Sequence, residues 1–89
     1  MEDRVVLVIY RLPIDKKNRK PTGYGFGFVL KPSSSPFFNK IVLIRRRNLR
    51  QGQRWKKLRE NMRVECRLEE LENGKTKLEA RDIVILGYP

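Results

Sequence analysis

Apolar residues occur along this chain in short runs and in alternation with polar residues, a pattern typical of β-strands. A β-branched run predicts a first strand over residues 4–11, which Pro13 ends. Residues 15–22 are polar and basic and are predicted to form a loop. A second strand is predicted over residues 23–30, where glycine alternates with aromatic residues.

The middle of the chain continues this pattern and then interrupts it. Proline and serine at residues 32–36 predict a turn, because proline removes a ladder donor and serine competes for backbone hydrogen bonds. A third strand is predicted over residues 38–46, where four aliphatic residues lead into three arginines. In residues 48–61, the spacing of Trp55 and Leu58 indicates a short helical turn or a compact loop.

The last third of the chain predicts two paired strands. Over residues 62–69, charged residues alternate with an apolar set that faces the core, namely Met62, Val64, Cys66 and Leu68. The Asn-Gly pair at residues 73–74 predicts a tight hairpin, because both residues tolerate positive φ. In the fifth strand the apolar phase shifts by one residue between Ala80 and Ile83, which indicates a bulge near residues 81–82.

These elements predict an all-β fold. Five short strands with a long loop or short helical turn between the third and fourth are typical of a small antiparallel barrel, closed or partly closed. The chain has no internal repeat and no amphipathic helix long enough for a bundle. We therefore expect residues 1–89 to form one domain.

The second predicted strand carries an unusual aromatic stripe. Tyr24, Phe26 and Phe28 alternate with Gly25 and Gly27, so the three rings share one face and the glycines share the other. Glycine inside a strand is tolerated where a barrel bends sharply or another backbone comes close, so we predict glycines inside and rings outside. Exposed rings suit unpaired bases, each of which contributes about 1–3 kcal/mol by stacking. The alternative is that the rings pack under a loop or in a homodimer contact.

The charge is strongly basic and unevenly distributed. Lys and Arg number 21 against 10 acidic residues, which gives a formal net charge of +11. Residues 40–60 carry nine basic residues and one acid, whereas acids outnumber basic residues by one in residues 61–89. An excess of this size favours a polyanionic partner. The alternative reading of the basic segments is a solvated charged loop.

The stretch Gly25-Phe26-Gly27-Phe28-Val29 resembles the first ribonucleoprotein-type motif of the cold-shock domain family. The likeness extends to Val8-Ile9-Tyr10 in the first strand and to residues 42–46 in the third, and it covers most of the chain. It implies a five-stranded oligonucleotide-binding (OB) fold and an RNA chaperone that binds single-stranded RNA or DNA. The chain departs from the family pattern in two places. Leu43, Arg45 and Arg46 replace aromatic and histidine positions, and the first loop is longer and more basic. Both departures shift the expected balance from base stacking towards phosphate contacts.

The candidate nucleic-acid-binding residues combine the aromatic stripe, the resemblance and the basic segments. They are Tyr10, Tyr24, Phe26, Phe28, Leu43, Arg45, Arg46, Arg47, Lys16, Lys17, Arg19, Lys20, Trp55, Lys56 and Lys57. Trp55 either anchors its loop to the barrel or stacks on a base. The acidic residues Glu65, Glu69, Glu70, Glu72 and Glu79 are predicted to face solvent as cross-strand partners of basic residues. They predict a second face unsuited to nucleic acid.

Other functions have little support in the sequence. The chain has no histidine and one cysteine, Cys66, which is expected to be an inert core residue, so we predict neither a disulfide nor a metal site. We expect no enzymatic activity, no cofactor and no small-molecule substrate, because no nucleophile-base pair or phosphate-cradling loop is present. The longest apolar run near the N-terminus has five residues, too few for a signal peptide or a membrane span, so we expect a cytoplasmic protein.

Two alternatives to single-strand binding remain open. In the first, the same barrel serves protein-protein interaction, or docks on a ribosome or another assembly, whereas for the single-strand-binding protein we expect a monomer or weak homodimer. In the second, the aromatic stripe belongs to an RNA-recognition motif. That fold fits badly, because it needs two long amphipathic helices.

Overall fold

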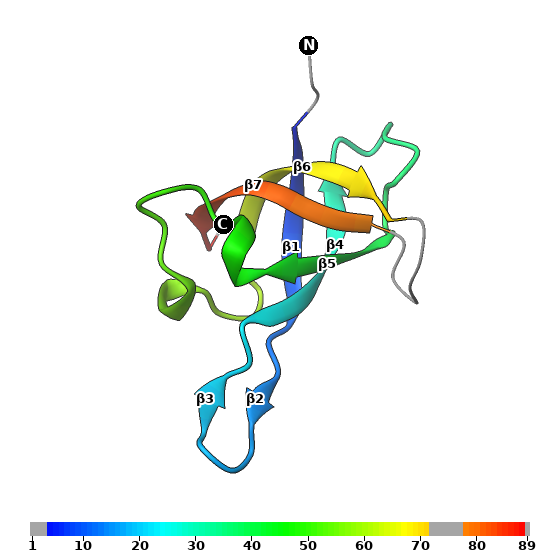
Figure 1. Cartoon of the computed structure of the whole chain (residues 1–89). Helices are drawn as coiled ribbons and strands as arrows, with labels where there is room; N and C mark the ends of the chain where they lie inside the picture. Colours follow the sequence, from blue (N-terminus) through cyan, green and yellow to red (C-terminus); the bar gives the residue numbers. More distant parts are fainter. Residues whose placement is uncertain (1–3, 72–77, 89) are drawn as a thin grey trace.

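Five long strands close into a barrel in the computed structural model, which describes residues 4–71 and 78–88 (Figure 1). In chain order they are β1 (Val5–Arg11), β4 (Tyr24–Lys31), β5 (Ile41–Arg45), β6 (Arg63–Glu70) and β7 (Leu78–Gly87). Around the barrel the order is β1-β4-β5-β7-β6, and β6 pairs with β1 to close it. The predicted all-β, five-stranded OB-like barrel is confirmed. One correction applies, since β5 and β7 run parallel and the sheet is mixed rather than purely antiparallel.

Short elements occupy the connections. Residues 15–22 were predicted to be a loop, but this region contains a small hairpin of β2 (Ile14–Asp15) and β3 (Lys20–Pro21) that projects from the barrel (Figure 1). Two short 3-10 turns, η1 (Arg46–Asn48) and η2 (Trp55–Lys57), lie between β5 and β6. They confirm the predicted helical interruption between the third and fourth long strands.

The interior is filled by alternate residues of the strands, as the period of two requires. The fully buried strand residues include Leu7, Ile9, Val29, Val42, Ile44, Val64, Cys66, Ala80 and Ile83. Trp55 and Leu58 cover one side of this core from η2 and the residue after it. The inward phase predicted for Val64 and Cys66 is confirmed, and Met62 and Leu68 are partly buried against the same core.

The two glycines of β4 face inward, as predicted. A Cβ on Gly25 would lie 2.7 Å from the Arg11 carbonyl oxygen, and a Cβ on Gly27 would lie 2.9 Å from the Val8 carbonyl oxygen. β1 therefore approaches β4 more closely than any side chain at these positions would allow. The same close approach directs Tyr24, Phe26 and Phe28 to the outer face.

The predicted bulge in the last strand is confirmed. Between β6 and β7 the pairing shifts from Glu65 opposite Val84 to Arg67 opposite Arg81, and Asp82 has a φ of 51°. The extra residue in β7 turns the Ile83 side chain back into the core. The predicted hairpin turn at residues 73–74 lies outside the described residues.

One strand boundary was wrong. The third strand was expected to begin at Phe38, but β5 begins at Ile41. Phe38 donates its backbone N–H to the Ser35 carbonyl at 3.1 Å, and Asn39 has a φ of 62°. These residues belong to the turn after β4, since positive φ does not continue a strand.

Candidate nucleic-acid interface

Four aromatic side chains lie together on the outer surface of β1 and β4. We call this set, Tyr10, Tyr24, Phe26 and Phe28, the aromatic face. The Tyr10 and Phe28 ring centroids are 5.1 Å apart, and those of Tyr24 and Phe26 are 6.0 Å apart, both in edge-to-face geometry. Tyr10 is 60% exposed and Tyr24 39%, while the two phenylalanines are half-buried. Edge-to-face pairing holds the rings in defined orientations and leaves ring surface accessible to a flat ligand.

β5 extends this face on one side. Leu43 lies opposite Phe26, Ile41 opposite Phe28 and Arg45 opposite Tyr24. Leu43 and Arg45, two positions that the cold-shock resemblance singled out, therefore lie on the outer side of β5 beside the aromatic face. Ile41 is 48% exposed on the same face and was not among the predicted site residues, because it appeared to belong to a continuous apolar run.

Arg45 is held by a buried carboxylate. Its Nε donates to Glu79 Oε1 at 2.9 Å, and the Glu79 side chain is 2% exposed. Glu79 Oε2 accepts from Asn48 Nδ2 at 3.1 Å and lies 2.8 Å from an Arg81 nitrogen. Glu79 was predicted to face solvent, and that prediction was wrong. The carboxylate is inside because donors from β5, η1 and β7 converge on it and offset its desolvation.

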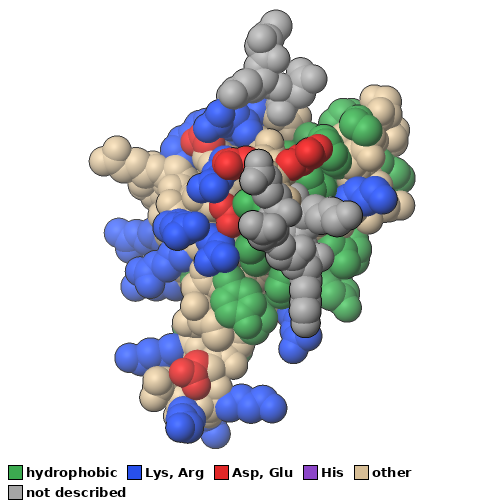
Figure 2. Space-filling view, turned by 45° about the vertical axis from the view of Figure 1, so that its right-hand side comes forward, with side chains coloured by type: hydrophobic (Ala, Val, Ile, Leu, Met, Phe, Trp, Pro, Cys, Tyr) green, Lys and Arg blue, Asp and Glu red, His purple; other side chains and the backbone are tan. Residues whose placement is uncertain are grey.

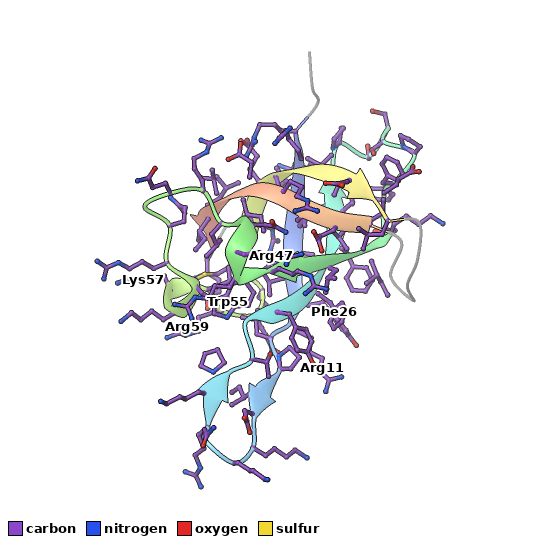
Figure 3. The ribbon with its side chains drawn as sticks, viewed as in Figure 1. Arg11, Phe26, Arg47, Trp55, Lys57 and Arg59 are labelled. Carbon is purple, nitrogen blue, oxygen red and sulfur yellow. The ribbon has the colours of Figure 1, made fainter. Side chains whose placement is uncertain are left out.

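The predicted basic residues fall into two groups. Lys16, Lys17, Arg19 and Lys20 lie on the projecting hairpin, where Figure 2 shows blue side chains at the lower end of the molecule. Arg46 and Arg47 lie in η1 directly after Arg45, while Lys56 and Lys57 lie in η2. In Figure 3, Lys57 and Arg59 lie around η2, on the opposite side of the Trp55 label from Phe26.

A groove runs between the projecting hairpin and the segment that connects β5 to β6. We call it the cationic groove; its volume is about 920 Å³. The basic residues that line it are Lys20, Arg46, Arg50, Arg54 and Lys56, and no acidic residue of the described ranges lines it. Arg50 and Arg54 belong to the basic segment 40–60 but were not among the candidate site residues, and the folded loop brings them into the same groove as Lys20.

Trp55 forms the floor beneath this groove. It is 7% exposed and belongs to the hydrophobic core together with Leu58, whose N–H donates to the Trp55 carbonyl at 2.9 Å. Of the two roles considered for this tryptophan, anchoring of the loop is the one that the burial supports. Too little ring surface is exposed for a base to stack on it.

Asp82, at the bulge, joins two arginines from distant parts of the chain. Arg4 lies 2.8 Å from one of its oxygens, and Arg50 binds both oxygens at 2.8 and 2.9 Å. The hydrogen bond from Arg50 holds the pKa of Asp82 well below its usual range, and the pKa of Arg50 is raised in turn. This bidentate pair fixes the Arg50 end of the loop to β7.

In residues 4–71 and 78–88, no cluster of three or more His, Cys, Asp or Glu side chains is arranged to hold a metal ion. No helix in these ranges has the length and apolarity needed to span a membrane. Comparison of the chain with protein-family models, with curated proteins and with solved structures finds no match, so the cold-shock resemblance rests on the motif residues alone.

Proposed function

We propose that this protein binds single-stranded nucleic acid, RNA or DNA, and holds its bases unpaired in the manner of an RNA chaperone. The observation that carries the proposal is the aromatic face, in which Tyr10 and Tyr24 are exposed on the outside of an OB-like barrel. A soluble domain gains nothing from exposing such rings to water, whereas unpaired bases stack on them regardless of sequence.

The charge around this face supports the same proposal. Arg45, Arg46 and Arg47 are all exposed where β5 ends, next to Tyr24. Arg45 is oriented by Glu79 and keeps 45% of its side chain exposed, so its guanidinium plane is available for stacking or for a phosphate. Together, the rings and these cations fit the two components of a single strand, its bases and its backbone.

The proposal is tested by replacing the rings. The double variant Phe26→Ala and Phe28→Ala should bind a fluorescent single-stranded oligonucleotide about tenfold or more weakly, as followed by fluorescence anisotropy. Phe38→Ala is the matched control, because Phe38 is also exposed but lies in the turn after β4. Circular dichroism checks that both variants fold.

Two outcomes would contradict the proposal. One is an unchanged affinity of the double variant for the single strand. The other is wild-type binding to duplex as tight as to the single strand. A stable homodimer that buries the rings, detected by light scattering, would favour the alternative of a protein interaction surface.

A further inference from the structure

The cationic groove has a preformed shape. At its start the Arg46 N–H donates to the Gly23 carbonyl at 2.8 Å, and the Arg50 N–H donates to the Ile83 carbonyl at 2.9 Å. Further along, the Ile85 N–H donates to Gln53 Oε1 at 2.8 Å. With Trp55 buried below, the connecting segment is tied to the barrel along its length. A ligand entering the groove therefore need not order the loop first, which lowers the entropic cost of binding.

The cations of the groove are mostly uncompensated. Arg50 is paired with Asp82, but Lys20, Arg46, Arg54 and Lys56 make no ion pair with any described residue. Like charges that converge on one groove repel one another until an anion enters. Because the uncompensated charges are distributed along the groove, a chain of phosphates fits them better than a single small anion.

The groove begins where the aromatic face ends. Gly23 and Arg46 line the groove, and the residues next to them in sequence, Tyr24 and Arg45, are paired across β4 and β5 on the aromatic face. The two surfaces therefore meet at one end of the β4–β5 pair, and Figure 1 shows the hairpin and the β5–β6 segment on either side of that end.

We infer that a single strand stacked on the aromatic face continues past Tyr24 into the cationic groove, which binds the phosphates of its flanking nucleotides. This inference rests on the proposed function. The groove offers cations but little exposed ring surface, so it contacts the backbone and not the bases. The complete site is thus longer than the aromatic face, and its second part is independent of base sequence.

The test compares oligonucleotides of two lengths, within the range of about 4 to 16 nucleotides that single barrels of this kind bind. One oligothymidylate of about 4 nucleotides is long enough for the aromatic face only, and one of about 12 nucleotides reaches the groove as well. The variant Arg54→Gln with Lys56→Gln removes two groove cations. The control Lys31→Gln with Lys40→Gln removes the same charge from residues outside the groove.

We expect the groove variant to lose about tenfold in affinity for the longer oligonucleotide and less than about twofold for the shorter one. The slope of log affinity against log salt for the longer oligonucleotide should fall in magnitude by about 1.4, from about 0.7 for each lost phosphate contact. The control should change the affinity for both oligonucleotides little and equally.

The possible failures are distinguishable. If the groove variant and the control weaken binding of the longer oligonucleotide equally, the groove has no special part and the inference is overturned. If wild-type protein binds neither oligonucleotide, or if Phe26→Ala with Phe28→Ala binds both normally, the proposed function itself fails and the inference fails with it.

Discussion

Gly27 lies on the inner side of β4, directly against β1. A Cβ at this position would be 2.9 Å from the Val8 carbonyl oxygen and 3.2 Å from Ile44 Cδ1. The first of these atoms belongs to the backbone of a paired strand, so it cannot move away without disturbing the β1–β4 ladder. The glycine is therefore a packing requirement of the barrel.

Gly27→Ala should consequently destabilise the protein. The added methyl group overpacks the β1–β4 contact, and we expect a loss of about 1–3 kcal/mol in the free energy of unfolding. Urea denaturation followed by tryptophan fluorescence measures it, since Trp55 is buried in the folded core. An unchanged denaturation midpoint would show that the two strands can separate slightly without cost.

Cys66 illustrates a different effect of the interior on a single residue. Its thiol is fully buried, and this burial raises its pKa to about 12 from an ordinary value of 9.0. The thiolate is the reactive form, so the native thiol should be unreactive at mildly alkaline pH.

We therefore predict that a thiol reagent such as dithionitrobenzoate modifies Cys66 at least about tenfold faster in denaturant than in buffer at neutral to mildly alkaline pH. The sign of the pH effect follows from the direction of the shift. The folded state holds the Cys66 proton more tightly than the unfolded state does. The stability that the protonated thiol contributes is therefore fully present below pH 9.0, and it is lost as the pH rises towards about 12. Rapid stoichiometric labelling of the native protein would contradict the prediction.

At the scale of elements, Glu79 connects three parts of the fold. Its carboxylate accepts hydrogen bonds from Arg45 of β5 and Asn48 of η1, and it lies beside Arg81 of its own strand. These bonds to Glu79 stabilise the parallel β5–β7 pair. In the described residues, these two strands pair through Leu43, which lies opposite Glu79.

Replacing Glu79 with Gln tests this role. The amide nitrogen of Gln would face two donors, Arg81 and Asn48. Arg45 would lose its counter-charge, while Arg81 would keep its ion pair with Glu69. We expect a loss of about 2 kcal/mol in the free energy of unfolding, the size typical of a hydrogen bond to a charged group. Glu70→Gln, at an exposed position on β6, is the control and should change stability little. Equal stability of the two variants would mean that the cluster adds nothing to the fold.

The same elements show which parts of the structure the sequence can predict. Strand positions follow from alternation, and the bulge in β7 follows from the phase shift, because both are local consequences of which residues avoid water. Glu79 could not be placed correctly, because it alternates in sequence like a surface residue and its partner Arg45 is 34 positions away. The start of β5 was misplaced, since the apolar residue Phe38 continues the strand pattern into a turn.

The candidate site likewise has a part that the sequence predicts and a part that it does not. The aromatic face was predictable, because alternation with glycine already assigns Tyr24, Phe26 and Phe28 to one side of a strand. The cationic groove was only partly predictable. Its basic residues come from two segments, and no pattern within either segment indicates that Lys20 and Arg54 line the same groove.

At the scale of the whole molecule, charge has opposite effects on binding and on stability. The chain carries a formal net charge of +11 on 89 residues, and the uncompensated cations of the groove line one surface between the hairpin and the β5–β6 segment. Before any ligand binds, this arrangement raises the energy of the folded state. Salt screens that repulsion, but it also weakens attraction to a polyanion.

The free protein should therefore become more stable with added sodium chloride over the range in which its affinity for single strands falls. Arg54→Gln with Lys56→Gln should raise the midpoint of thermal unfolding at low salt by about 2 °C, the size expected for exposed charges in a domain of this length. This gain should shrink as salt is added, because screening already removes the repulsion in the wild type. Calorimetry at several salt concentrations measures both effects. If the groove variant is less stable than the wild type, these two side chains stabilise the loop. The cations of the groove would then not lower the stability of the free protein.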